Sequence, residues 1–116
     1  MGKQPDAYLE IALSALQKTV RYVGNLSLQE YLESDLCRSA VERELEIAGD
    51  ALGQLRRQYP DVFANIPEGS EVVAFRNVLA HGYASLNHRI VFAAATAKAP
   101  PLIRALELLL DEFPSG

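Results

Sequence analysis

The feature that most constrains the fold of this chain is the helical spacing of its apolar residues. Between about Asp35 and Tyr59, apolar residues recur at steps of three and four, which aligns them along one face of a helix. A similar stripe precedes it near the N-terminus. The two stripes are Leu9, Leu13, Leu16, Val20 and Val23, and then Val41, Leu45, Ala48, Leu52 and Leu55. No alternating strand pattern and no internal repeat occurs, so the sequence predicts an all-helical fold.

Residues that start and stop helices divide the chain into segments. Gly24-Asn25 is expected to end the first helix, because glycine tolerates a positive φ. Ser27-Leu28-Gln29-Glu30 has the pattern of a capping box and predicts a short turn of helix after it. Pro60 is expected to end the second long helix, and residues 61–67 are predicted to form a loop.

The rest of the chain predicts three further helical segments. One runs from Glu68 or Ser70 to about Ala80, with Val72, Phe75 and Leu79 on its buried face. Another begins after Asn87, whose side chain suits an N-cap. Pro100-Pro101 predicts a kink or a break before the apolar stripe resumes at Leu102, Leu106, Leu109 and Phe113. The prediction is an all-α antiparallel bundle of four or five helices, in one domain spanning residues 1–116.

Composition narrows the class of protein. Apolar residues are 49% and charged residues 22% of the 116, as in ordinary globular domains. The net charge is −4 and the pI about 5.1, which argues against a general nucleic-acid binder held by charge alone. The N-terminus lacks the hydrophobic core of a signal peptide, and no apolar run is long enough to cross a membrane. A cytoplasmic protein is expected.

The cysteine and histidine content excludes two kinds of site. Cys37 is the only cysteine, so no internal disulfide can form, and we interpret it as a small buried apolar side chain. No Cys/His cluster has zinc-ligand spacing. No metal and no cofactor is therefore expected. His88 has no evident partner in the sequence, and we interpret it as a surface or helix-start residue.

The segment Arg76-Asn77-Val78-Leu79-Ala80-His81-Gly82-Tyr83 carries the chemistry of the chain. A guanidinium offers a planar set of donors to phosphate oxygens, and an imidazole exchanges protons near neutral pH. Metal-free RNA cleavage needs both functions. One group takes the proton from the ribose 2′-OH or gives one to the leaving 5′-oxygen, and another stabilises charge on phosphorus oxygens.

Helical spacing leaves two interpretations of this segment open. On an ideal helix Arg76, Ala80 and Tyr83 share one face, and Asn77 and His81 share the adjacent one. With Gly82 ending the helix, the four polar side chains could converge on one patch. Alternatively, the imidazole only contacts helix-end carbonyls, and the guanidinium forms an ordinary salt bridge with Glu71 or another acid.

The same segment resembles the R-x4-H-x-Y motif of HEPN-domain proteins, specifically the HepT-like toxins encoded beside minimal nucleotidyltransferases. Residues 38–51, Ile66-Pro67 and Pro101-Leu102-Ile103 are also similar to that family, so the resemblance covers essentially the whole chain. Departures are Glu44, where the family more often has Asn, the stretch Ala97-Lys98-Ala99 in place of a more acidic run, and the absence of a Trp ahead of the motif.

The resemblance implies a helical homodimer in which the motifs of both subunits face one cleft. It implies a metal-independent endoribonuclease, the toxin of a type VII-like toxin–antitoxin pair. Arg76 and His81 would be catalytic and Asn77 supporting. Tyr83 would be the tyrosine to which the partner nucleotidyltransferase transfers AMP, which silences the toxin.

Two other functions remain open at this point. The chain could be a non-catalytic HEPN adaptor that binds a nucleotidyltransferase partner and a nucleotide, with Arg76 and Tyr83 contacting them. It could also be a structural dimer with a vestigial motif. Which RNA would be cut, and where, does not follow from the sequence, because no base-stacking platform is evident.

Overall fold

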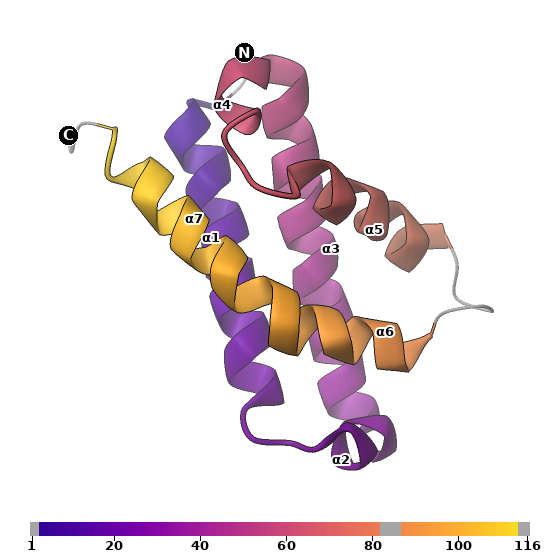
Figure 1. Cartoon of the computed structure of the whole chain (residues 1–116). Coiled ribbons are helices and arrows are strands. Elements are labelled where there is room, and N and C mark those ends of the chain that lie inside the picture. Colours follow the sequence, from indigo (N-terminus) through magenta and orange to yellow (C-terminus); the bar gives the residue numbers. More distant parts are fainter. Residues whose placement is uncertain (1–2, 82–86, 114–116) are drawn as a thin grey trace.

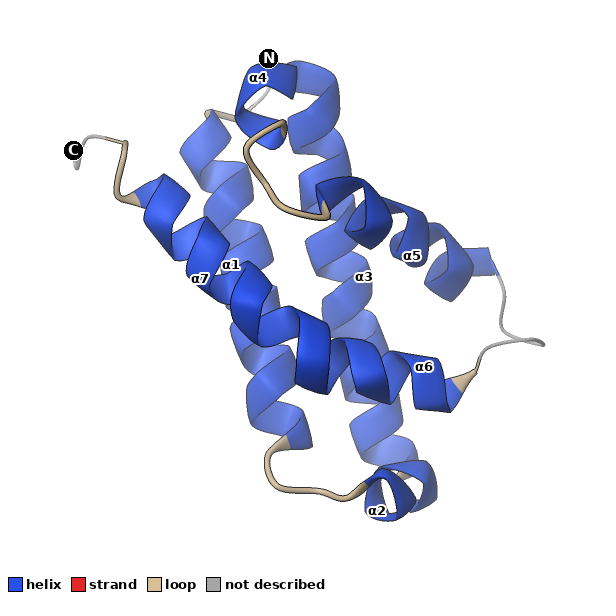
Figure 2. Ribbon diagram, in the orientation of Figure 1, coloured by secondary structure: helices blue, strands red, loops and turns tan. Residues whose placement is uncertain are grey.

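The computed structural model describes residues 3–81 and 87–113, with His81 described by its backbone alone. Helices make up all of the regular structure in these two ranges, which confirms the predicted all-α class (Figures 1 and 2). The elements are α1 (Pro5–Val23), α2 (Leu28–Glu33), α3 (Asp35–Gln58), α4 (Pro60–Phe63), α5 (Gly69–His81), α6 (His88–Ala93), the π-helix η2 (Ala94–Lys98) and α7 (Ala99–Leu110).

Two long antiparallel helices form the centre of the molecule. α1 and α3 run side by side in opposite directions, and the second half of the chain packs across them (Figure 1). α5 lies on α3, whereas η2 and α7 lie on α1. With α6, η2 and α7 counted as one rod, four long rods make up the bundle, and the short α2 and α4 connect them. This arrangement agrees with the predicted four- to five-helix bundle.

The core follows the predicted stripe on α3 and departs from it on α1. All five predicted positions of α3 are buried. On α1, Val20 is instead 37% exposed, and the fully buried Thr19 takes the core position beside it. The Thr19 hydroxyl donates a hydrogen bond to the Ala15 carbonyl (2.9 Å), so its burial leaves no unpaired donor. Ala12 and Ala15 are also buried. Their small side chains let α1 lie close to its neighbours.

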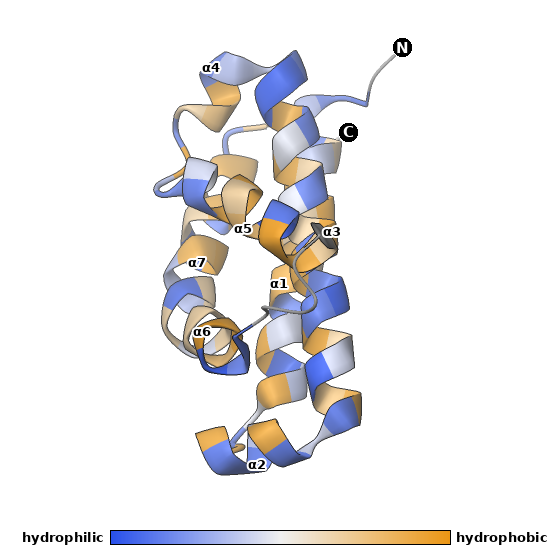
Figure 3. Ribbon diagram, turned by 90° about the vertical axis from the view of Figure 1, so that its right-hand side faces the viewer, coloured by the Kyte–Doolittle hydropathy of each residue, from blue (hydrophilic) through white to orange (hydrophobic). Residues whose placement is uncertain are grey.

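Each long helix has an apolar face and a polar face. Apolar and polar positions alternate around each of them, so that each helix presents one apolar face to the interior (Figure 3). On α5 the buried apolar side chains among the described residues are Val73 and Leu79, whereas Val72 and Phe75 are half-buried. The predicted buried position at Val72 was therefore wrong by one residue, because Val73 is buried in its place, whereas the predicted burial of Leu79 is confirmed.

Most predicted helix ends are confirmed. Gly24 has φ 53° and ends α1. The Ser27 hydroxyl accepts from the Glu30 backbone, while Ser27 N donates to the Glu30 carboxylate, which is the predicted capping box. Asn87 caps α6 by accepting from the backbone N–H groups of Arg89 and Ile90.

The prediction of a loop over residues 61–67 was wrong at its start. The four-residue helix α4 begins at Pro60, because proline suits the first helical turn, where no N–H is needed. Its last residue, Phe63, is buried and packs against Gly69 at the start of α5. This turn of helix therefore fixes the point at which α5 begins.

The irregularity predicted at Pro100-Pro101 takes another form. The chain stays helical from His88 to Leu110, and a π-helical segment, η2, lies immediately before the prolines. In it the Ala99 N–H donates to the Ala94 carbonyl. Neither proline has an N–H to continue an α-helical ladder, so the wider turn takes the place of the predicted break, and α6 and α7 form one rod (Figure 2).

Candidate functional site

Helix α5 carries the first six residues of the motif, Arg76 to His81, and its packing on α3 sets the position of Arg76. The helices approach closely at Gly49, where an added Cβ would lie 2.3 Å from the Cβ of Arg76. One turn further along α3, a Cβ added at Gly53 would lie 3.6 Å from Val73 Cγ1, which is an ordinary contact distance. Glycine at position 49 therefore allows α5 to lie where it does, and it holds the backbone of Arg76 against α3.

The Arg76 side chain reaches the surface. It is 32% exposed, and its Nη2 lies 3.8 Å from Asp50 Oδ1 on α3. Its Nη1 donates to Asn77 Oδ1 at 3.4 Å. The Nε atom is buried without a hydrogen-bond partner among the described atoms. The acid beside Arg76 is thus Asp50 and not Glu71, and the ion pair is long and open enough for the guanidinium to bind another anion.

The remaining motif residues are only partly described. Asn77 is exposed beside Arg76. His81 is the last residue of α5, about 7.5 Å along the helix axis from Arg76, and its side chain lies outside the description. Tyr83 lies outside the described residues altogether. The convergence of Arg76, Asn77, His81 and Tyr83 therefore stays a prediction, with Arg76 and Asn77 in contact.

A polar cavity of about 340 Å³ opens beside Arg76. Its charged lining comes from the start of the chain (Lys3), from α3 (Arg43, Glu46 and Asp50) and from α5 (Arg76). None of the first four was predicted as a site residue. Helical spacing could have indicated the α3 members, because Arg43, Glu46 and Asp50 are three, four and seven residues apart and so share one face.

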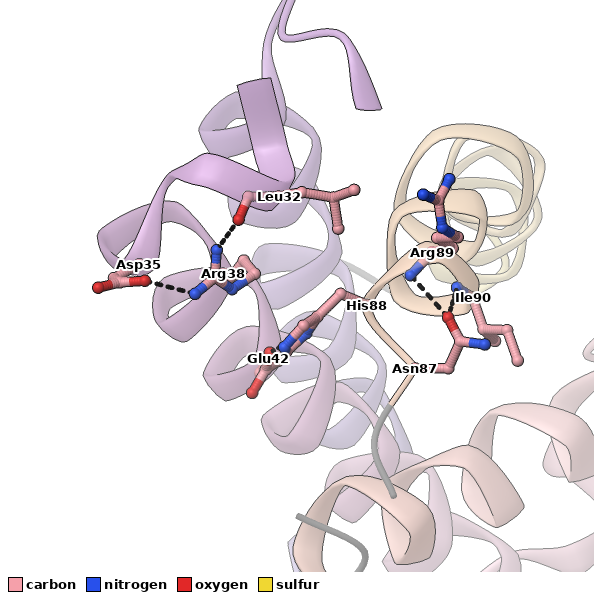
Figure 4. Close-up of polar contacts among 8 residues, drawn as sticks. All are labelled: Leu32, Asp35, Arg38, Glu42, Asn87, His88, Arg89 and Ile90. Carbon is pink, nitrogen blue, oxygen red and sulfur yellow. Dashed lines mark hydrogen bonds and ion pairs between the residues drawn. The ribbon is translucent and has the colours of Figure 1, made fainter. Parts of the chain in front are cut away.

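His88 has a partner that the sequence did not indicate. It is the first residue of α6, and its Nδ1 lies 3.3 Å from Glu42 Oε2 on α3 (Figure 4). The geometry between them does not meet that of a hydrogen bond. Nearby, Arg38 donates to the Leu32 carbonyl and to Asp35. The Arg38 contacts join the start of α3 to the end of α2, and the pair with Glu42 gives His88 a structural interpretation at the start of α6.

Burial raises the pKa values of two side chains, those of Tyr31 and Cys37. Burial raises the pKa of the Tyr31 phenol well above its ordinary range, and the ring packs on Phe92 with centroids 5.2 Å apart. Burial also raises the pKa of the Cys37 thiol, whose Sγ lies 3.5 Å from the Tyr22 carbonyl. A thiol that resists ionisation is a poor nucleophile. Cys37 is half-buried and not fully buried as predicted.

An apolar groove of about 440 Å³ lies between α5 and the rod formed by α6, η2 and α7. Phe75, Ile90 and Leu102 contribute to it. At its edge Lys98 Nζ donates to Glu68 Oε1 at 3.1 Å, and this hydrogen bond lowers the pKa of Glu68. Lys98, one of the departures from the family pattern, thus joins η2 to the turn before α5.

The described part of the chain contains neither a candidate metal site nor a helix that could cross a membrane. No group of three or more His, Cys, Asp and Glu side chains there is placed to hold a metal ion. None of the helices traced in residues 3–81 and 87–113 has the length and apolar character needed to traverse a bilayer.

An all-α bundle whose sequence has an Arg-x4-His-x-Tyr motif, with the arginine and histidine on a helix packed against a long central helix, is typical of a HEPN-type protein. Residues 12–109 match the family model described as Ribonuclease HepT-like. The chain belongs to the HepT-like ribonuclease family, and this membership confirms the resemblance found in the sequence.

Curated relatives from two organisms carry ribonuclease names. "Putative RNase TTE0752" of Caldanaerobacter subterraneus subsp. tengcongensis is 26% identical over 110 residues, which cover 95% of this chain and 97% of the relative. "Putative RNase MJ1380" of Methanocaldococcus jannaschii is 24% identical over 103 residues, covering 89% and 94%. "Putative RNase MJ0127" of the same organism is 23% identical over 111 residues, covering 96% and 91%. No solved structure matches this chain significantly.

Proposed function

We propose that this protein is a metal-independent endoribonuclease that cleaves cellular RNA, the toxin of a type VII-like toxin–antitoxin pair. The observation that carries the proposal is the state of Arg76. Its guanidinium is open to solvent, loosely paired at 3.8 Å and placed beside a polar cavity. It lies on the same helix as His81, in a chain of a ribonuclease family.

The chemistry follows from the two side chains. The His81 imidazole takes the proton from a ribose 2′-OH, and the 2′-oxygen attacks the adjacent phosphorus. The bond from phosphorus to the 5′-oxygen breaks, and that oxygen takes up a proton from the imidazolium or from water. Arg76 donates to the phosphorus oxygens, where negative charge builds up. Asn77 holds the guanidinium or the phosphate in place. The products are a 2′,3′-cyclic phosphate and a 5′-hydroxyl.

Removal of divalent metal is expected to leave cleavage unchanged. Purified protein incubated with RNA in excess EDTA should produce fragments at the rate seen with Mg²⁺, because neither proton transfer nor charge stabilisation is assigned to a metal ion. Mass spectrometry of the fragments should show 2′,3′-cyclic phosphate ends. Loss of cleavage in EDTA, restored by one added metal, would contradict the mechanism. Linear 3′-phosphate ends at the earliest times would contradict it as well.

We further propose that two copies of the chain associate, so that two motifs border one cleft. Two exposed apolar side chains support this: Val78, within the motif on α5, is 49% exposed, and Ile90 on α6 is 57% exposed. Two Arg76 residues in one cleft would also offset the overall charge of −4. Light scattering should give twice the chain mass of 12.7 kDa, and a monomer at micromolar concentration would count against the shared cleft.

The proposed partner is a minimal nucleotidyltransferase that transfers AMP to Tyr83. Such a modification would place a bulky anion where an RNA phosphate must bind. Both proteins would then act in the cytoplasm, where the RNA is. Intact mass of the protein made with its partner should show one added adenylate on Tyr83, absent from a Tyr83→Phe variant.

The second candidate function is the non-catalytic adaptor, which binds the nucleotidyltransferase and a nucleotide. The cavity beside Arg76 would suit a nucleotide in that case too. Expression of the chain alone distinguishes the two functions. Growth arrest that co-expression of the partner relieves supports the ribonuclease, whereas normal growth in both conditions supports the adaptor.

A further inference from the structure

The cavity beside Arg76 combines charges of both signs from three parts of the chain. Its cations are Lys3, Arg43 and Arg76, and its acids are Glu46 and Asp50. The amide of Gln54 also borders it, donating to Asp50 Oδ2 at 2.9 Å. At about 340 Å³ the cavity is at the lower end of the range for small-molecule sites, roughly 300–1,000 Å³. That volume suits one ligand group of moderate size.

Lys3 is held at this cavity although it precedes the first helix. The Tyr59 hydroxyl donates to the Lys3 carbonyl at 2.9 Å, and the Lys3 backbone N–H donates to the Tyr8 hydroxyl at 3.3 Å. Its Nζ lies 5.8 Å from the centroid of the Tyr8 ring. These contacts attach the start of the chain to both α1 and the end of α3, so Lys3 is a built part of the cavity.

The cations of the cavity are available to a ligand, because their ion pairs are weak. Arg43 Nη1 lies 3.4 Å from Glu46 Oε1, and the Arg43 side chain is 67% exposed. Arg76 and Asp50 are 3.8 Å apart, and Asp50 is 51% exposed. Open, solvent-exposed ion pairs of this kind contribute little to stability. A phosphate that accepts from a guanidinium in a charge-assisted hydrogen bond can therefore replace them.

The mixture of charges selects the chemistry of the ligand. A simple anion would meet two carboxylates, and an uncharged sugar would leave the three cations unused. A nucleotide unit satisfies both sets, because its phosphate accepts from Arg and Lys while its ribose hydroxyls and base N–H groups donate to carboxylates. Since Arg76 belongs both to the cavity and to the motif, a phosphate bound at Arg76 places the neighbouring nucleotide inside the cavity.

We propose that this cavity is the binding subsite for the ribonucleotide next to the cleaved bond, with Arg43 as its principal cation besides Arg76. The proposal rests on the proposed ribonuclease function. It assigns to Lys3, Arg43 and Asp50 a role in substrate binding that the motif does not include.

Binding and cleavage by an Arg43→Ala variant test this subsite. In a His81→Ala background, which blocks turnover, fluorescence anisotropy with a short single-stranded RNA should show affinity lowered about five- to tenfold by Arg43→Ala. The dependence of log K on log salt should fall by about 0.7, the value for one lost contact to single-stranded nucleic acid. With His81 intact, KM should rise by a similar factor, and kcat should change less than twofold.

Arg104→Ala is the matched control, because Arg104 is an exposed arginine on α7 outside the cavity. It should leave affinity and salt slope at the parent values. If both arginine variants behave alike, the subsite is wrong, even where His81→Ala has confirmed the ribonuclease. If His81→Ala protein still cleaves RNA, the proposed mechanism fails, and a selective loss of binding in Arg43→Ala would still identify the cavity as a nucleotide site.

Discussion

Replacement of Arg76 or His81 by alanine is expected to reduce RNA cleavage by roughly 10²–10⁴-fold, the range for loss of a general acid/base or a charge-stabilising donor. The helical fold should persist in both variants. The Arg76 side chain makes a long ion pair at 3.8 Å and a hydrogen bond to Asn77, and alanine keeps the Cβ that packs at Gly49. His81 is the last residue of α5, where alanine is compatible with a helix. Circular dichroism would check the fold, and initial cleavage rates would check the chemistry.

Two controls make this result specific to the motif. His88→Ala removes the other histidine of the chain, which faces Glu42 at the start of α6, and should leave the cleavage rate within severalfold of the parent. Arg76→Lys keeps the charge but loses the planar set of donors, so its rate should fall between those of the parent and Arg76→Ala. Retained cleavage by purified His81→Ala protein would rule out the assigned proton transfer.

Gly49→Ala is expected to destabilise the protein and to impair the site, whereas Gly53→Ala should not. Both glycines lie in α3, where alanine is intrinsically favoured by about 1 kcal/mol. At position 49 the new Cβ would lie 2.3 Å from the Arg76 Cβ, too close for two atoms fixed near their backbones. Helix α5 would have to move, at a cost of about 1–3 kcal/mol or more. We expect this cost to exceed the gain in helix propensity, so the free energy of unfolding should fall.

The nearest contact of a Cβ at Gly53 is ordinary, 3.6 Å from Val73 Cγ1. Gly53→Ala should therefore raise the free energy of unfolding by up to about 1 kcal/mol. Urea denaturation of both variants measures the difference. Cleavage by Gly49→Ala should fall with its stability, because the backbone of Arg76 is displaced. Equal stability of the two variants would show that the close approach at Gly49 does not hold α5 in place.

Some parts of the fold and of the site could be predicted from the sequence because they depend on neighbouring residues alone. The caps at Ser27 and Asn87 and the end of α1 at Gly24 are local, and all three are confirmed. Asn77 could likewise be placed beside Arg76 from adjacency. The short α4 was missed, since its four residues are too few to show a helical period.

Other parts depend on which helices meet, and the sequence did not show this. The pairing of His88 with Glu42 joins residues 46 positions apart, and Asp50 reaches Arg76 across 26. Lys3 reaches the cavity only because Tyr59 and Tyr8 hold the start of the chain. Spacing along one helix carries no information about such pairs.

By itself, the sequence determined that the protein is all-helical, where most of its helices begin and end, and which segment carries an arginine and a histidine five residues apart. Those properties follow from local periodicity, capping and residue chemistry. Only the tertiary structure decided that α5 lies against Gly49, that Asp50 is the acid beside Arg76, and that a mixed-charge cavity opens next to it. The physical reason is that helix contacts depend on the volumes of side chains distant in sequence, and a single missing Cβ sets the closest approach of two helices.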